Sequence, residues 1–254
     1  NVWRLKLWNK RLNKTTLPVL VFSYPWLDWF HPDRLGAQLK RVLPFLEAMF
    51  AEAKTDSPSA TVGVLIGASP DTINQPRPAC AYSASWVDTA CWLADFLCLP
   101  QKPFDNDAQT QEFRVSLSNI NGWYFHRCCY TLLISQGPPP GAEYGNTKLH
   151  ADRGWCHFEK AASMVSKKSW LMLDFGAYQG ASKFGSNAAS GKDTAIGQMM
   201  STRLPMIDPP AFADDMRKRV ASGNLNFTAG ADMEFVINQY SDGFIHNLNI
   251  IFAL

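Results

Sequence analysis

The stretch that decides the fold is residues 129–165, which read CYTLLISQGPPPGAEYGNTKLHADRGWCHFEKAASMV. It opens with a short run of apolar residues over 129–134, which is typical of a strand covered on both faces. A turn with three consecutive prolines follows. The next apolar residues recur at helical spacing, at Trp155, Phe158, Ala162 and Val165. This order predicts one strand–helix unit of an α/β sheet.

Similar units lie on both sides of this stretch. Short apolar runs predict further strands at 17–22, 61–66, 91–96, 170–175 and 248–252. Helical spacing predicts further helices at 39–50, 107–124, 208–220 and 233–240. Strands that alternate with helices favour a mostly parallel open sheet with helices on both faces. We therefore expect an α/β fold in which residues 1–254 form a single domain.

Within these helices, the sequence also predicts which residues face the core, cap a helix or form an ion pair. The first helix should turn Leu39, Val42, Leu46 and either Met49 or Phe50 inward, with Pro44 as a kink or restart. Asp152 is the expected N-cap of the helix that contains Trp155. Asp215 and Arg219 are spaced four residues apart, so they should pair on the solvent face of the helix over 208–220.

Three segments fall outside the alternation of strands and helices. Residues 1–16 contain Trp, Leu, Lys and Arg, and we expect an N-terminal arm docked on the domain. Two inserted loops are predicted, at 67–89 and 176–201, from their Ser-, Pro-, Gly- and Ala-rich composition. Glycines raise the backbone entropy that is lost when a loop becomes fixed. The loop over 176–201 should therefore be mobile in the free chain and ordered by a partner.

Composition excludes several classes of protein. The chain is 46% hydrophobic and 18% charged, which is ordinary for a globular domain. A net charge of +2 without a clustered basic face argues against nucleic-acid binding. No apolar stretch approaches the roughly 20 residues of a transmembrane helix. Six cysteines without a disulfide framework favour an intracellular protein, but a chain beginning at Asn1 leaves cytoplasm and organelle open.

Familiar catalytic and cofactor motifs are missing from the sequence. There is no Gly-x-Ser-x-Gly elbow, and residues 185–192 do not match the spacing of a phosphate-binding loop. The histidines and cysteines show no metal-ligand spacing, so neither a metal nor a bound cofactor is expected.

Glu159 is the candidate catalytic residue. On a helical wheel it lies about 40° from Trp155, beside the apolar stripe. A carboxylate there is partly desolvated, which raises its pKa and suits it to acid–base chemistry or to stabilising a cation. The alternative is a structural Glu that packs against an arginine or against loop amides.

The helix that contains Glu159 also carries a motif that resembles a known protein family. Arg153-Gly154-Trp155-Cys156 followed by Glu159 resembles the S/R-x-W-C-x-x-E stretch of TIR domains. The wider pattern is similar to TIR-like proteins of unicellular algae and other protists in the segments SYPW 23–26, LAD 93–95, LPQ 99–101, SNINGWY 118–124, PAF 210–212 and FTAGAD 227–232. The resemblance implies a TIR-like, flavodoxin-like fold. It also implies that Glu159 corresponds to the Glu of the members that cleave NAD.

Departures from that family guide the functional hypothesis. Tyr24-Pro25 stands where relatives have a His-Arg pair, and Cys98 stands where they have Ser. Because polar groups at strand ends bind ligands in open α/β sheets, their loss favours a non-catalytic module that binds other proteins. Such a module could be one subunit of a larger assembly or an oligomer.

Two alternatives stay open. One is an NAD glycohydrolase or nucleoside-processing enzyme that uses Glu159, for which NAD is the substrate. The other is a nucleotide-sensing domain that binds without turnover. In the enzyme, the residues expected to line the ligand pocket are Ser23, Trp26, Asp95 and Trp155.

Overall fold

A computed structural model of the chain reveals its architecture. It describes residues 19–28, 33–56, 91–93, 104–127, 129–138, 143–185, 191–201, 204–227 and 230–252. The predicted N-terminal arm over 1–16, the strand at 61–66, the loop at 67–89 and the side chain of Asp95 lie outside the described residues.

Four strands in the described part of the chain form one parallel sheet. They are β1 (Val19–Ser23), β2 (Cys91–Leu93), β3 (Cys129–Leu133) and β4 (Met172–Asp174), in the order β2-β1-β3-β4. Each of the predicted runs at 17–22, 91–96, 129–134 and 170–175 therefore contains a strand where the structure describes it, and these strands are neighbours in one parallel sheet.

Helices follow the strands as an α/β fold requires. The described helices are α2 (Ala37–Asp56), α4 (Asp107–Phe125), α5 (Gly154–Ser166), α6 (Ala195–Met199), α7 (Pro209–Ala221) and α8 (Asp232–Phe252). Short 3-10 turns at His150–Asp152, Ser169–Leu171 and Phe175–Ala177 join them to the strands. Asn106 caps α4 and Asp208 caps α7, each by accepting a hydrogen bond from a backbone N–H three residues later.

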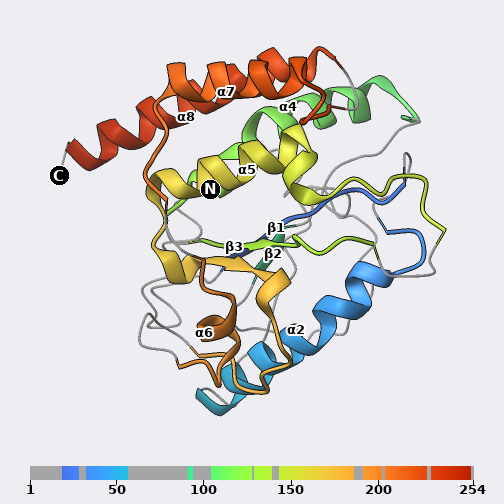
Figure 1. Ribbon diagram of the computed structural model, residues 1–254, viewed down its shortest axis with the longest axis vertical. Coiled ribbons are helices and arrows are strands. Elements are labelled where there is room, and N and C mark those ends of the chain that lie inside the picture. The colour runs from blue at the N-terminus through green and yellow to red at the C-terminus, as the bar shows by residue number, and fades with distance from the viewer. Residues whose placement is uncertain are drawn as a thin grey trace.

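The helices cover both faces of the sheet. In Figure 1, α4 and α5 lie over one face with α7 and α8 as a further layer outside them, while α2 and α6 lie under the other. Right-handed crossovers between parallel strands require helices on both faces of this sheet. The connection from β1 goes to β2 on one side, whereas the connection from β3 goes to β4 on the other side. The expectation of helices on both faces is confirmed.

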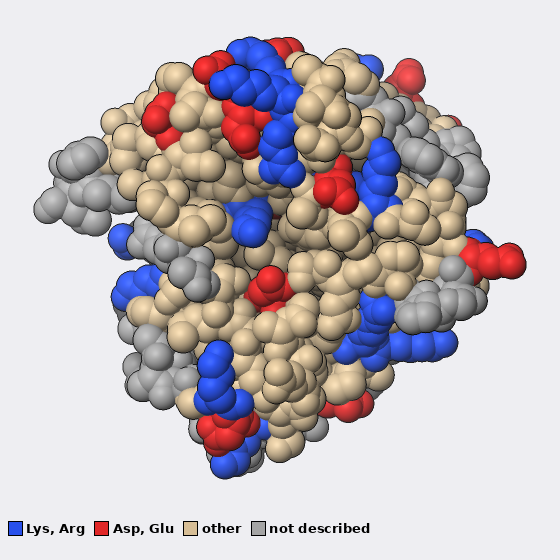
Figure 2. Space-filling model, viewed as in Figure 1, with Lys and Arg blue, Asp and Glu red and all other residues tan. Residues whose placement is uncertain are grey.

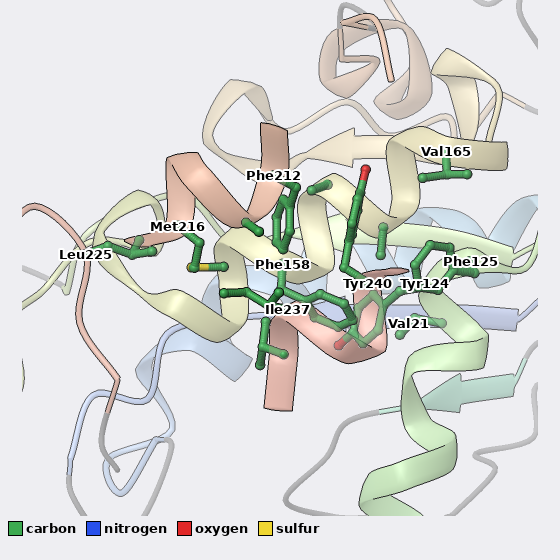
Figure 3. Packing of buried hydrophobic residues seen from close by; sticks show 14 of the residues in the cluster. Val21, Tyr124, Phe125, Phe158, Val165, Phe212, Met216, Leu225, Ile237 and Tyr240 are labelled. Carbon is green, nitrogen blue, oxygen red and sulfur yellow. The ribbon is translucent and has the colours of Figure 1, made fainter. Parts of the chain in front are cut away.

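Two apolar cores result from this arrangement. The core between the sheet and α4, α5, α7 and α8 is rich in aromatic residues (Figure 3). Within it, the rings of Phe212 and Tyr240 stack with their centroids 3.9 Å apart. Its fully buried side chains include Val21, Phe158, Phe212, Met216 and Val236. The second core joins α2 and α6 to the opposite face through Phe22, Phe45, Leu132, Leu173 and Ile196.

The inward face of α2 differs from the prediction. Val42, Leu46 and Met49 are buried as expected, but Phe45 takes the central position and Leu39 is 62% exposed. The helix runs without interruption across Pro44. A sheet is wide, so it covers a broader arc of helix surface than one line of residues, and Phe45 lies within that arc.

The C-terminal segment also differs. A strand was expected near 248–252, but α8 continues to Phe252 as one helix. Asp215 and Arg219 do not form a simple solvent-facing pair, since both contact His157 of α5. Asp215 Oδ2 lies 3.1 Å from His157 Nε2, and Arg219 donates to Nδ1 at 3.0 Å.

The segment over 176–201 is packed on the domain where the structure describes it. It contains α6, whose Ala195, Ile196 and Met199 are completely buried. Ser201 N donates to Met172 O at 3.0 Å, which fastens the segment to the outer strand β4. The prediction of a loop without its own secondary structure is therefore wrong, because these few apolar side chains bury enough surface to offset the entropy of its glycines.

Lys167 is completely buried at the junction of α4, β3 and α5. Its ammonium donates to three carbonyls, those of Trp123 at 3.0 Å, His126 at 2.6 Å and Cys129 at 3.0 Å. Carbonyls at a helix C-terminus have no partner within the helix, and a cation there is also favoured by the helix dipole. One side chain thus caps α4 and joins it to the start of β3.

We predict that Lys167→Met destabilises the chain by about 3 kcal/mol, because charge-assisted hydrogen bonds to buried carbonyls are lost. Urea unfolding measures the loss. Lys218→Met, on the exposed side of α7, is the matched control and should change stability by less than about 0.5 kcal/mol. Equal effects of the two substitutions would contradict the capping role.

Candidate functional site at the carboxyl edge of the sheet

The strand order creates a crevice at one edge of the sheet. From β1 the chain crosses to β2, and from β3 it crosses to β4 on the other side. Ligands of open α/β sheets bind outside the carboxyl ends of the strands at this reversal. The reversal here lies between β1 and β3, which pair over five residues from Val19 with Cys129 to Ser23 with Leu133.

Side chains at this edge point toward α5. Phe22 and Leu132 pack into the core on the α2 side, so their neighbours Ser23 and Leu133 face the opposite way. The register aligns Ser23 with Leu133 and Leu133 with Asp174. Ser23, Leu133 and Asp174 therefore form a row across three strands beneath α5.

Ser23 and His150 form the most deeply buried polar pair of the site. Ser23 Oγ lies 2.7 Å from His150 Nε2, and both residues are buried. Burial is the main cause that lowers the pKa of His150 to about 4; the charge of Lys160 acts in the same direction, whereas Asp174 opposes the shift. His150 is thus neutral near neutral pH, and Ser23, predicted as a ligand residue, contacts this histidine.

Ser135 and Asp174 form a second polar pair. Ser135, just beyond β3, donates a short hydrogen bond to Asp174 Oδ1 at the end of β4. Gly176 N donates to the same oxygen at 2.9 Å. A Cβ at position 176 would collide with Ser135 Oγ, so glycine allows the close approach of this turn to β3.

Glu159 lies above the same edge. Ser163 of α5 is hydrogen bonded to Thr131 of β3, with the oxygens 2.9 Å apart. Glu159 precedes Ser163 by four residues, so it occupies the same helix face one turn nearer the helix N-terminus. Because α5 runs antiparallel to β3, that turn lies about 6 Å nearer the carboxyl edge, level with Leu133. Glu159 is half-buried there.

The segment over 143–153 crosses the end of β1 and closes one side of the site. Asn146 N donates to Leu27 O at 2.8 Å, and Gly145 N donates to Asp28 Oδ1 at 2.8 Å. Arg153 is buried and donates to Trp26 O at 2.7 Å. We call residues 143–153 the strap. Its contacts hold His150 over Ser23.

The other predicted ligand residues lie at different places. Trp26 is half-buried beside the strap, in contact with Arg153 through its carbonyl. Trp155 lies between α5 and α8, where its Nε1 donates to Asp232 Oδ2 at 3.1 Å and its ring packs on Phe235. Its surroundings are those of a core residue at a helix interface. The structure thus brings Ser23 to the row beneath α5, while Trp155 packs toward α8.

The N-termini of the two nearest helices are capped in different ways, and that of α5 differs from the prediction. Arg153, not Asp152, is the N-cap of α5, and no side chain caps it. The start of α2 is capped by Asp33, whose carboxylate accepts from Ala37 N at 2.7 Å and Leu39 N at 3.0 Å. Helix N-termini are common phosphate sites. The N-terminus of α2 is already occupied by the carboxylate of Asp33.

The surface over the site is concave. Figure 2 shows a hollow near the centre of this face, below α5 and above β4, with a basic and an acidic side chain on its walls. Lys160 on α5 and Asp174 on β4 act with opposite sign on the protonation of His150, so charges of both signs surround this point. Such a setting suits a polar ligand with both hydroxyl and charged groups.

Ser135, His150 and Asp174 are site residues that the sequence did not single out. Ser135 and Asp174 each lie at or just beyond the end of an apolar run, and this signal could have identified them. His150 had no such signal, because it is placed by the strap, whose path depends on contacts with the loop after β1.

The described residues offer two further observations. None of their helices is long and apolar enough to cross a membrane. They contain no group of three or more His, Cys, Asp or Glu side chains placed to hold a metal ion.

We predict that stability falls as the pH drops from about 6.5 to 4, because the unfolded chain binds a proton at His150 before the folded chain does. The full contribution is about 3 kcal/mol and is present above pH 6.5. His150→Gln should remove this part of the pH dependence. Urea unfolding of both chains at pH 7, 5.5 and 4 measures it, and parallel pH profiles would contradict the burial of a neutral His150.

Comparison of the chain with family models, with curated proteins and with solved structures finds no match. What the site does is therefore inferred from its own residues and from the fold that places them.

Proposed function

We propose that the carboxyl edge of the sheet binds a nucleotide and that Glu159 promotes cleavage of the nicotinamide–ribose bond of NAD. The observation that carries this proposal is the Ser163–Thr131 hydrogen bond, from which helix spacing puts Glu159 one turn nearer the last residues of β1 and β3. Ser23, His150, Ser135 and Asp174 add polar groups to the same edge.

The chemistry follows from the charge that develops as the bond breaks. The electron pair of the C–N bond leaves with nicotinamide, and the ribosyl carbon becomes an oxocarbenium-like cation. A carboxylate held beside that carbon stabilises the cation, and a half-buried setting strengthens the interaction relative to water. Water then adds to the carbon and releases a proton, giving ADP-ribose, nicotinamide and H⁺.

The strand order supports the TIR-like assignment that we propose. The order 2-1-3-4 is that of flavodoxin-like doubly wound sheets, with the ligand at the switch between the first and third strands. The Trp155-Cys156 and Glu159 motif lies on the helix that follows the third strand. Motif and topology thus agree on the same edge of the sheet.

We predict that the purified chain releases nicotinamide from NAD and that Glu159→Gln lowers the rate on the order of 100-fold or more, as for loss of a transition-state charge partner. Product analysis by liquid chromatography measures the rate. Glu47→Gln changes an exposed carboxylate on α2, on the opposite side of the sheet, and should leave the rate unchanged. An inactive wild-type chain, or a Glu159→Gln variant at full rate, would overturn the proposal.

A second candidate is the non-catalytic interaction module. The packing of α6 on the domain removes the mobile loop as its support. Three exposed leucines, spaced four residues apart, favour the interaction module instead. Leu39 and Leu43 are on α2 and Leu35 is in the turn before it, with exposed fractions of 62%, 46% and 44%. Residues at this spacing share one side of a helix.

We propose a second copy of this chain as the occupant of that strip. If two α2 helices pack antiparallel, with Leu39 of one copy against Leu43 of the other, the same offset places Glu47 near Arg34 at each end. Both of these side chains are exposed, and Arg34 also pairs with Asp28 of its own copy at 3.1 Å. The self-complementary pairing required at a two-fold interface is thus available. The strip is short compared with a stable dimer interface, so the association should be weak and reversible.

Leu39→Asp should therefore abolish self-association without unfolding the chain, because a charge would be buried against the partner copy. Sedimentation velocity over a range of concentrations measures the monomer–dimer equilibrium. Leu204→Asp, at another exposed leucine, 54% exposed, is the matched control and should associate like the wild type. A wild-type chain that stays monomeric at every concentration would contradict the module.

A further inference from the structure

We propose that Asp174 is the carboxylate that anchors the sugar of the ligand, by accepting a hydrogen bond from a hydroxyl of the ribose that carries the scissile bond. This inference rests on the proposed function and assigns a role to a residue outside the family-like motif. Asp174 is oriented by two hydrogen bonds of the chain itself, and it lies one strand away from Leu133.

Asp174 is oriented before any ligand arrives. Its Oδ1 accepts from Ser135 Oγ of the adjacent strand end and from Gly176 N two residues later. These donors come from two directions, so the carboxylate is fixed in one orientation. An ionised carboxylate only accepts hydrogen bonds and has about four acceptor sites. The contacts to Asp174 from described residues all go to Oδ1, so the acceptor sites of Oδ2 are available for a ligand.

The place of Asp174 matches a sugar located beneath Glu159. Leu133 is the register partner of Asp174, and Glu159 lies level with Leu133 on the same side of the sheet. Adjacent parallel strands are about 4.8 Å apart. The Glu159 carboxylate therefore approaches from α5, and the Asp174 carboxylate lies one strand to the side. A ribose between them could present its anomeric carbon to Glu159 and a hydroxyl to Asp174.

The surrounding groups favour a hydroxyl over an anionic group. An anion such as phosphate would be repelled by the Asp174 carboxylate, and the start of α2, on the other face of the sheet, already holds the Asp33 carboxylate. His150, buried beside Ser23, adds no positive charge near neutral pH because burial lowers its pKa to about 4. The sugar hydroxyls of the ligand remain as the donors that this corner of the site can bind.

The test combines a substitution with a change in the ligand. The probes are NAD and its analogues lacking the 2′- or the 3′-hydroxyl of the nicotinamide ribose. Their dissociation constants are measured by calorimetry in the Glu159→Gln background, so that NAD is not consumed. Asp174→Asn should weaken NAD binding by roughly 10- to 100-fold, the range for hydrogen bonds to a charged group. For one of the two deoxy analogues the same substitution should have little further effect.

Two variants serve as controls. Ser135→Ala leaves the carboxylate but removes one donor that orients it, so we expect a smaller loss of NAD affinity than for Asp174→Asn. Asp214→Asn, an exposed carboxylate on α7, should bind all three ligands like its parent. Thermal melting of each variant checks that it is folded, and Ser135→Ala decides the case if Asp174→Asn does not fold.

The outcomes separate the two proposals. If the parent chain binds NAD but Asp174→Asn binds it equally well, or loses affinity equally for all three ligands, the anchoring role is overturned and the proposed function stands. If the parent chain binds none of the three ligands, both proposals are overturned.

Discussion

The parallel pairing of β1 with β3 is the constraint on which the candidate site depends. Its register aligns Ser23 with Leu133, and the next pairing aligns Leu133 with Asp174. Because side chains alternate between the faces of a strand, a shift of one residue in either pairing would turn one of these side chains into the apolar core on the α2 side. The two cores prevent such a shift, since each requires its own alternate set of apolar residues.

A single hydrogen bond transfers this register to the helix above. Thr131 and Ser163 are both completely buried, and their hydroxyls bind each other between β3 and α5. A buried hydroxyl without a partner is costly, so the pair specifies how far along the sheet α5 sits. The position of Glu159 follows from it. The strap adds a second connection, because Ser23 and His150 join the end of β1 to the segment that leads into α5.

The protein satisfies its buried charges in two different ways. Lys167 stays charged, and its ammonium donates to three backbone carbonyls at the junction of α4 and β3. His150 instead becomes neutral, since burial lowers its pKa and Ser23 is its hydrogen-bond partner. Lys167 thus joins α4 to β3 through its charge. His150 is neutral near neutral pH, so it adds no positive charge to the polar edge of the sheet. The charged side chains placed around this edge include Glu159, Lys160 and Asp174.

How much the sequence could determine depends on whether a feature is local. Short apolar runs identified β1, β3 and β4 and the alternation of strands with helices, because a strand buried on both faces must be apolar along its length. The predicted strand over 248–252 was wrong because a short apolar run at the end of an amphipathic helix looks the same as a buried strand.

The site required the tertiary structure. The sequence by itself placed Glu159 beside the apolar stripe of its helix and Ser23 at the end of a strand. It could not show that His150, Ser135 and Asp174 gather with them, since the partners lie 127 residues apart for Ser23 and His150 and 39 apart for Ser135 and Asp174. It also could not show that α6 packs against the sheet. Both depend on strand order and register, which come from the matching of buried surfaces across the whole fold and not from any local pattern.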